Sequence, residues 1–131
     1  MTYRLRRSVG DERGNATVGF ALVTPMLLAV ALAVLQLALI LHVRATVAAA
    51  AAEGARAAAQ SGADATAGMR RTRAVLEGNM AAEAVESIDV QRELHDGVLV
   101  VRVQVRTRLP LLGMLGPTSM QVDGHALQEF A

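Results

Sequence analysis

The pattern of apolar and polar positions divides the chain into one long aliphatic segment and a following region of shorter apolar patterns. No charged residue lies between Arg13 and Arg44, and most residues between them are aliphatic. An α-helix rises about 1.5 Å per residue, so about 20 apolar residues are needed to cross the hydrocarbon core of a bilayer. Residues 18–41 meet that length. The pattern therefore predicts a membrane-spanning helix near the N-terminus, over residues 15–43.

This helix is expected to continue beyond the membrane. Residues 44–62 are rich in Ala, the strongest helix former, and no helix stop precedes Ser61. Pro25 lies within the span, where neighbouring groups can satisfy the backbone that a proline leaves unpaired. The sequence therefore predicts one helix whose first half lies in lipid and whose Ala-rich second half extends it.

The C-terminal residues, 63–131, predict a small extracytoplasmic domain. Residues 69–86 predict a second, shorter helix after a polar loop at 62–68. From residue 88 onward, apolar residues recur at every second position, which is the period of a strand. Asp96–Gly97 then predicts a hairpin turn.

The clearest strand follows this turn, where apolar and polar residues alternate strictly. The inward positions are Val101, Val103, Val105, Thr107 and Leu109, and the outward positions are Arg102, Gln104, Arg106 and Arg108. A last strand is predicted at 119–127, and the apolar loop 110–117 could fill the core or dip into the membrane surface. The predicted fold class is α+β, in which the long helix and the short helix precede a three-stranded antiparallel sheet.

Arginines flank the span unequally, which predicts its orientation. Four of them precede the span in a basic leader, residues 1–14, whereas only Arg44 and Arg56 follow it closely. Basic residues beside a span are retained in the cytoplasm, so we expect a single-pass protein of the plasma (inner) membrane with a cytoplasmic N-terminus. A cleaved signal sequence is a weaker alternative because the apolar run is too long. Twin-arginine export is also weaker, because acidic residues follow the Arg6–Arg7 pair.

Composition limits the chemistry of the chain. Apolar residues make up 53% of it but aromatic residues only 2%, so a core of Ala and Val buries little area per residue. We therefore expect the C-terminal domain to be stabilised by a partner, the bilayer or the long helix. The absence of Cys excludes disulfides, and a net charge of +1 argues against nucleic-acid binding. His42, His95 and His125 are not at metal-ligand spacing. No catalytic triad or phosphate-binding loop is present, so we expect neither an enzyme nor a cofactor.

Two parts of the long helix carry candidate contact residues. Small residues recur every fourth position at Thr17, Ala21, Pro25, Ala29 and Ala33, which lets membrane helices approach closely, although an Ala-rich span also produces such a row by chance. Gln36 could hydrogen-bond across a helix interface or reach toward the membrane surface. Farther along, Glu53, Arg56 and Gln60 share one side of the helix, opposite a face of alanines. Glu53 and Arg56 can pair across one turn.

Taken together, the N-terminal landmarks resemble a known family. The stretch ERGNATVGFALVTPMLLAVALAVLQLALILHVRATVAAAAAEGARAAA is similar to the N-terminal signature of TadE-like proteins, which are pilin-like components of the tight-adherence (Flp-type) pilus machinery. The matching positions are Arg13–Gly14, Asn15–Ala16–Thr17–Val18, Phe20, Pro25 and Glu53–Gly54–Ala55–Arg56. The resemblance is strong over residues 12–60, and the E-G-A-R group is its more discriminating half.

The resemblance implies a processing site, and the chain departs from the family pattern at one position. A prepilin peptidase would cleave between Gly14 and Asn15. Family members that follow the prepilin rule carry Glu five residues after the cleaved Gly, where it pairs with the freed amine of a neighbouring subunit. Gly19 occupies that position here. Docking through that carboxylate is therefore not expected of this chain.

Two functions from different classes follow. The first is a structural minor pilin or pseudopilin of a tight-adherence pilus, secretion and cell-adhesion system. Its partners would be the membrane, other pilin-like subunits, the assembly platform and a prepilin peptidase. The alternative is a generic single-span anchor that displays a small envelope-facing binding domain. An enzyme is the third and weakest reading.

Overall fold

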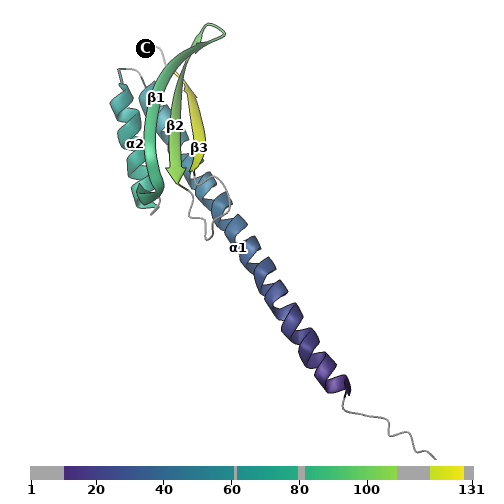
Figure 1. Cartoon of the computed structure of the whole chain (residues 1–131). Coiled ribbons are helices and arrows are strands. Elements are labelled where there is room, and N and C mark those ends of the chain that lie inside the picture. Colours follow the sequence, from purple (N-terminus) through teal and green to yellow (C-terminus); the bar gives the residue numbers. More distant parts are fainter. Residues whose placement is uncertain (1–10, 61, 80–81, 109–118, 129–131) are drawn as a thin grey trace, which may run out of the picture. The chain divides into compact units, whose positions relative to one another are not determined.

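The computed structural model describes residues 11–60, 62–79, 82–108 and 119–128 (Figure 1). The chain divides into two compact units, Met1–Leu37 and Ala38–Ala131. Helix α1, Asp11–Ala59, contributes residues to both units. The predicted α+β class is confirmed, because a long apolar helix and a short helix precede a three-stranded antiparallel sheet.

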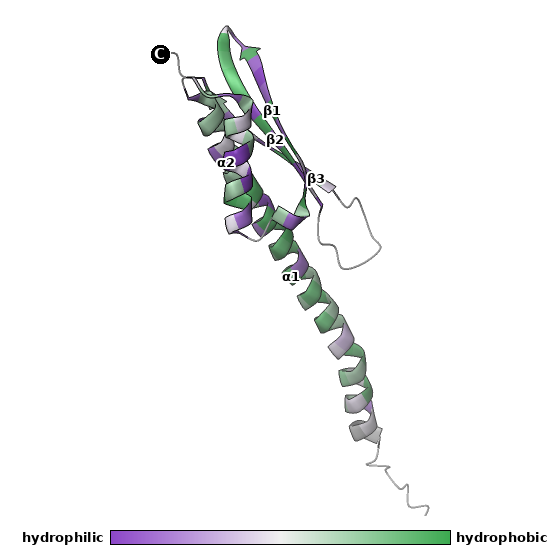
Figure 2. Ribbon diagram, turned by 90° about the vertical axis from the view of Figure 1, so that its left-hand side faces the viewer, coloured by the Kyte–Doolittle hydropathy of each residue, from purple (hydrophilic) through white to green (hydrophobic). Residues whose placement is uncertain are grey.

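In the first unit, α1 buries almost none of its side chains. Phe20 is 74% exposed and Leu22 is 71% exposed. Among the described residues, Gly14–Ala59 is the one helix that is long and apolar enough to cross a membrane. Figure 2 shows hydrophobic residues along much of it. The Thr24 hydroxyl donates to the Phe20 carbonyl oxygen at 2.8 Å, so this polar group is satisfied within the helix, as hydrocarbon surroundings require.

The second unit is a layer of helix on one face of a sheet. Its strands are β1 (Val85–His95), β2 (Val98–Arg108) and β3 (Ser119–Leu127), in that spatial order. Helix α2 (Ala65–Gly78) and the last turns of α1 lie together on one side of this sheet, as Figure 2 shows. A short 3₁₀ helix, Ala82–Ala84, leads into β1.

Small aliphatic residues form the core of this unit. The predicted alternation along β2 is confirmed, because Val101, Val103, Val105 and Thr107 are fully buried. The predicted inward position at Leu109 lies outside the described residues, as does the loop 110–117. From the helices, the core receives mainly alanines of α1 together with Val47 and Leu76. Because none of the core residues that the structure describes is aromatic, this core depends on short distances between backbones.

The predicted hairpin turn and the predicted last strand both agree with the structure. Asp96 and Gly97 join β1 to β2 with φ angles of 51° and 82°. Two successive left-handed residues make the type I′ turn that suits the right-handed twist of a hairpin, and Asp-Gly supplies it. The last strand occupies the predicted residues, 119–127.

The predicted bounds of the second helix, 69–86, were wrong. Helix α2 begins at Ala65, because the Asp64 carboxylate accepts a hydrogen bond from the Ala67 backbone N–H at 2.9 Å and so caps the first turn. It ends at Gly78, and β1 already begins at Val85. The predicted loop 62–68 is correspondingly shorter, since the capping aspartate was not recognised as a helix start.

Capping by Asp64 predicts a pH-dependent contribution to stability. The hydrogen bond from the Ala67 backbone lowers the pKa of the Asp64 carboxyl, and the charge of Arg70 adds to this effect. A lowered folded-state pKa stabilises the fold above the ordinary aspartate pKa, and the contribution is lost as the pH falls through the folded-state value. We expect Asp64→Ala to lower the urea midpoint of the detergent-solubilised chain at pH 7.

Asp64→Asn is the matched control, because it keeps the cap oxygen but removes the charge. Its midpoint at pH 7 should lie between those of the parent and Asp64→Ala. The gap between the parent and Asp64→Asn should narrow at pH 3. A gap that is unchanged or larger at pH 3 would contradict the assignment.

Candidate functional site

The three histidines lie on separate elements of the described chain. His42 lies on α1, His95 at the end of β1 and His125 on β3. His125 Nε2 accepts a hydrogen bond from Arg102 Nε at 3.1 Å. Across the part of the chain that the structure describes, no group of three or more His, Cys, Asp or Glu residues could hold a metal ion. The candidate site is therefore a pair of contact surfaces on α1.

The first contact surface is the apolar part of α1 in the first unit. The exposed residues of sequence interest there are Gly14, Asn15, Thr17, Gly19, Phe20, Ala21, Pro25, Ala29 and Ala33. Gln36 is half-buried. A Cβ atom added at Gly14 or Gly19 would meet nothing within 4 Å, so packing inside the chain requires glycine at neither position. This whole helix surface is available to lipid or to other helices.

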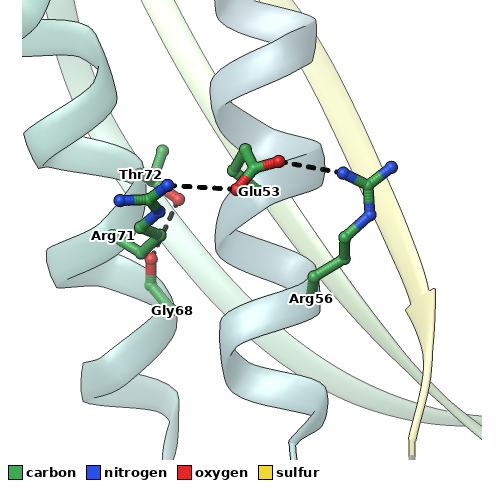
Figure 3. Close-up of polar contacts among 5 residues, drawn as sticks. All are labelled: Glu53, Arg56, Gly68, Arg71 and Thr72. Atoms are coloured by element: carbon green, nitrogen blue, oxygen red, sulfur yellow. Dashed lines mark hydrogen bonds and ion pairs between the residues drawn. The ribbon is translucent and has the colours of Figure 1, made fainter.

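The second contact surface is the E-G-A-R group near the end of α1. Figure 3 shows the Glu53 carboxylate between two arginines. It accepts from Arg56 Nη1 at 2.9 Å and from Arg71 Nη2 at 3.3 Å, and so connects α1 to α2. The Arg56 pair was predicted, whereas Arg71 was not singled out from its neighbours. All three side chains are at least 39% exposed, so each pair is worth roughly 0.2–1 kcal/mol.

Gly54, the next residue of the group, sets the distance between the two helices. A Cβ atom at Gly54 would overlap Thr72 Oγ1 and would lie 2.9 Å from the Gly68 carbonyl oxygen. A Cβ atom at Gly68 would in turn lie 2.8 Å from Ala58 Cβ. The buried Thr72 hydroxyl donates to the Gly68 carbonyl at 2.9 Å, so it is satisfied within α2. Helices α1 and α2 therefore touch through their backbones.

The side of α1 that faces the sheet approaches β3 just as closely. A Cβ atom at Gly124 would lie 2.5 Å from the Ala52 nitrogen and 2.6 Å from the Ala51 oxygen. Ala55 is fully buried in the same core. Sequence reasoning missed the role of Gly124, since a lone glycine in a strand signals only that another backbone approaches, not which one. The last turns of α1 thus contact both α2 and the sheet around the E-G-A-R group.

These features define an α+β protein with one exposed apolar helix and a small-residue core. A family model described as TadE-like protein matches residues 14–56, about a third of the chain. Over that segment the chain is similar to TadE-like proteins, as the N-terminal resemblance predicted. The match begins at Gly14 and ends at Arg56, the last residue of the E-G-A-R group. No curated protein and no solved structure matches the chain.

Close helix contact at Gly54 makes a size-specific prediction. Gly54→Ala should destabilise the second unit by about 1–3 kcal/mol, because the new methyl overlaps Thr72 although Ala is the better helix former. Chemical unfolding of the detergent-solubilised chain measures this difference. Adding Thr72→Ala should restore part of the loss, because it removes the overlapping hydroxyl.

Gly78→Ala provides the matched control within a helix. A Cβ atom there meets nothing within 4 Å, so the substitution should be neutral or stabilising by up to about 1 kcal/mol. Equal unfolding midpoints for Gly54→Ala and Gly78→Ala would show that the two helices are not in backbone contact.

Proposed function

We propose that the chain is a membrane-anchored, pilin-like structural component of a tight-adherence (Flp-type) pilus assembly or secretion system, acting as a minor pilin or pseudopilin. One observation carries the proposal: the TadE-like segment coincides with a helix whose apolar side chains are exposed. The family suggests a part in tight-adherence pilus assembly and an anchoring helix. The exposed helix supplies a surface for both lipid and other pilin-like helices.

The energetic argument starts from the side chains that this helix leaves uncovered. Fourteen large apolar residues between Val18 and Leu41 are exposed. Burying one such side chain is worth about 1.5–3 kcal/mol, so exposing all of them to water would cost tens of kcal/mol. A marginally stable protein cannot offset that cost. The segment therefore needs hydrocarbon around it, from lipid or from neighbouring helices.

The arginines that flank this segment support an orientation of the chain in the membrane. The proposed arrangement has a basic cytoplasmic leader at 1–14, the span at 15–43 in the plasma (inner) membrane, the Ala-rich extension at 44–62 and the extracytoplasmic domain at 63–131. The excess of arginine in the leader supports it. The proposed partners are the lipid bilayer, other pilin-like subunits and the assembly platform.

Contact with other subunits is proposed to run through the small-residue row rather than through a carboxylate. Gly19 offers no charge to a neighbouring N-terminus. Thr17, Ala21, Pro25, Ala29 and Ala33 lie exposed at four-residue intervals, which permits close helix approach. Gln36 adds one amide for a hydrogen bond between helices.

A span exchange tests the proposed function. Residues 18–41 are replaced by a Leu-rich segment of equal length in a host that assembles tight-adherence pili. We expect membrane retention after an alkaline wash but loss of piliation, because lipid accepts any apolar helix while subunit packing needs the small residues. The control exchange keeps Ala21, Ala29 and Ala33 and should retain piliation. Full piliation with the Leu-rich segment would instead favour a generic anchor.

Processing is tested separately by mass spectrometry. In cells that contain a prepilin peptidase, the mature chain should begin at Asn15, and Gly14→Leu should leave the leader attached. Gly19→Leu, a change of the same size in the same helix, should not affect cleavage. A parent chain that still begins at Met1 in those cells would remove the processing proposal.

A further inference from the structure

Helix α1 and strand β3 run in the same direction through the second unit. Ala51 of α1 lies against Gly124 of β3. Farther along both elements, Ala58 lies in one buried cluster with Val101 of β2, and Ala126 of β3 packs against that cluster. Figure 1 shows the last turns of α1 alongside β2 and β3. Following α1 back toward its N-terminus therefore leads to the end of the sheet where β2 finishes and β3 begins.

Arg44 of α1 lies level with this end of the sheet. Going back from Ala51, Arg44 is about 10 Å away along the helix, at about 1.5 Å per residue. Going back from Gly124, Gln121 is also about 10 Å away along the strand, at about 3.3 Å per residue. Gln121 is the partner of Arg106 in the sheet. Arg44 and Arg106 are therefore at the same height along the second unit, to within about one turn of helix.

The last row of the sheet, Arg108 with Ser119, lies farther in the same direction. It is about 7 Å beyond the row of Arg106, which corresponds to about four residues of α1 and so to the level of Ile40. Ile40 lies inside the proposed span, 15–43. The polar headgroup layer on each side of a bilayer is about 5–7 Å thick. If the span ends as proposed, the last two rows of the sheet lie at the depth of the lipid headgroups.

Three arginines are present at this end of the unit. Arg44 is exposed, and no described residue hydrogen-bonds or pairs with its guanidinium. Arg106 is exposed, and among the described residues its guanidinium reaches only a neutral side-chain amide of β3, at 3.5 Å. Arg108 is 73% exposed and pairs with Glu86 at 3.2 Å. Residues 109–118, which join β2 to β3 in the sequence, include no charged residue and so add no counter-charge.

The described acidic residues at the same end belong to the other half of the unit. Glu77 lies in the last turn of α2, Glu83 in the 3₁₀ helix and Glu86 at the start of β1, and α2 packs with both of these elements. Glu86 is already engaged by Arg108. On β3 the first acidic residue is Asp123, which is farther from the proposed membrane. The half formed by α1, β2 and β3 therefore has an excess of positive charge where it adjoins the span.

We propose that this end of the second unit binds the phosphate groups of anionic lipids through Arg44, Arg106 and Arg108, so that the β2–β3 side of the domain rests on the bilayer. Basic side chains at a membrane surface are attracted to anionic lipids, and the guanidinium group pairs well with phosphate oxygens. The inference deepens the proposed function and rests on its membrane span. The span anchors the chain, and the arginines fix the orientation of the domain above it.

Quenching of a fluorescent label by lipid tests the contact, because the chain contains no native Cys and single labels can be placed. Ser119→Cys and Leu127→Cys are labelled separately with the dye NBD in the full-length chain, which is reconstituted in phosphatidylcholine vesicles with or without phosphatidylglycerol. Both sites are exposed, at opposite ends of β3, about 26 Å apart. With a spin label on the lipid headgroup as quencher, we expect about twofold stronger quenching at Ser119, with a further gain from phosphatidylglycerol.

Neutral substitutions identify the residues responsible. A variant without the three charges should lose the gain that phosphatidylglycerol produces at Ser119; its changes are Arg44→Gln, Arg106→Gln and Arg108→Gln. Arg102→Gln is the matched control, because Arg102 also pairs with a glutamate on β1, Glu93, at 3.1 Å, but lies toward the other end of β2. This control should keep the full gain. Raising NaCl should reduce the gain in the parent, because salt screens exposed charges.

A single substitution guards against unfolding of the triple variant. Arg106→Gln breaks no ion pair among the described residues and should lower the gain by about a third, because it removes one of three equivalent attractions. An unchanged emission spectrum of the Leu127 label shows that the sheet is intact in each variant.

Any of three results would overturn the inference. The first is equal quenching at Ser119 and Leu127. The second is a gain from phosphatidylglycerol that persists without the three arginines, since the span alone would then explain it. The third is an equal loss of the gain in Arg102→Gln, which would show no preference for this end of the sheet. Each result leaves the span-exchange test of piliation unaffected, so failure of the lipid contact is distinguishable from failure of the proposed function.

Discussion

Contact between bare backbones is the constraint on which the second unit depends. Helix α1 touches α2 at Gly54 and Gly68, and it touches β3 at Gly124. The described core of this unit contains no aromatic side chain, so the area buried per residue is small and stability has to come from many short contacts at high packing density. The charged group around Glu53 then adds orientation between the helices rather than much energy.

In helix α1 the large apolar side chains are exposed and the small ones are buried, which is the reverse of the pattern in a water-soluble protein. The large aliphatic residues of α1, such as Leu22, are exposed, whereas the smaller alanines near its C-terminal end, such as Ala55, are buried. A helix in water would bury the larger residues first, since they lose the most contact with water. Size thus determines which part packs inside the chain, and hydrophobicity determines which part needs a membrane or a partner. One helix meets both requirements in succession.

Periodicity and turn chemistry sufficed for the elements, but not for the contacts between them. The span, the β2 alternation and the Asp96–Gly97 turn each follow from residues close in sequence, and each was predicted. The start of α2 was also encoded locally, by the Asp64 cap, but it was not predicted. The Glu53–Arg71 pair and the approach of Gly124 to α1 join residues far apart in the chain. No local pattern encodes a crossing point, so these required the structure.

The glycine and alanine lining of the second unit has an evolutionary consequence. Residues such as Gly54 and Ala58 are already near the lower limit of side-chain volume, so substitution there can add atoms but scarcely remove them. Mutational damage should accordingly arise by wedging elements apart rather than by hollowing them out. Serine, though polar, is then a milder replacement than leucine at such a position. Side-chain volume, more than polarity, therefore limits which substitutions can accumulate at these contact positions.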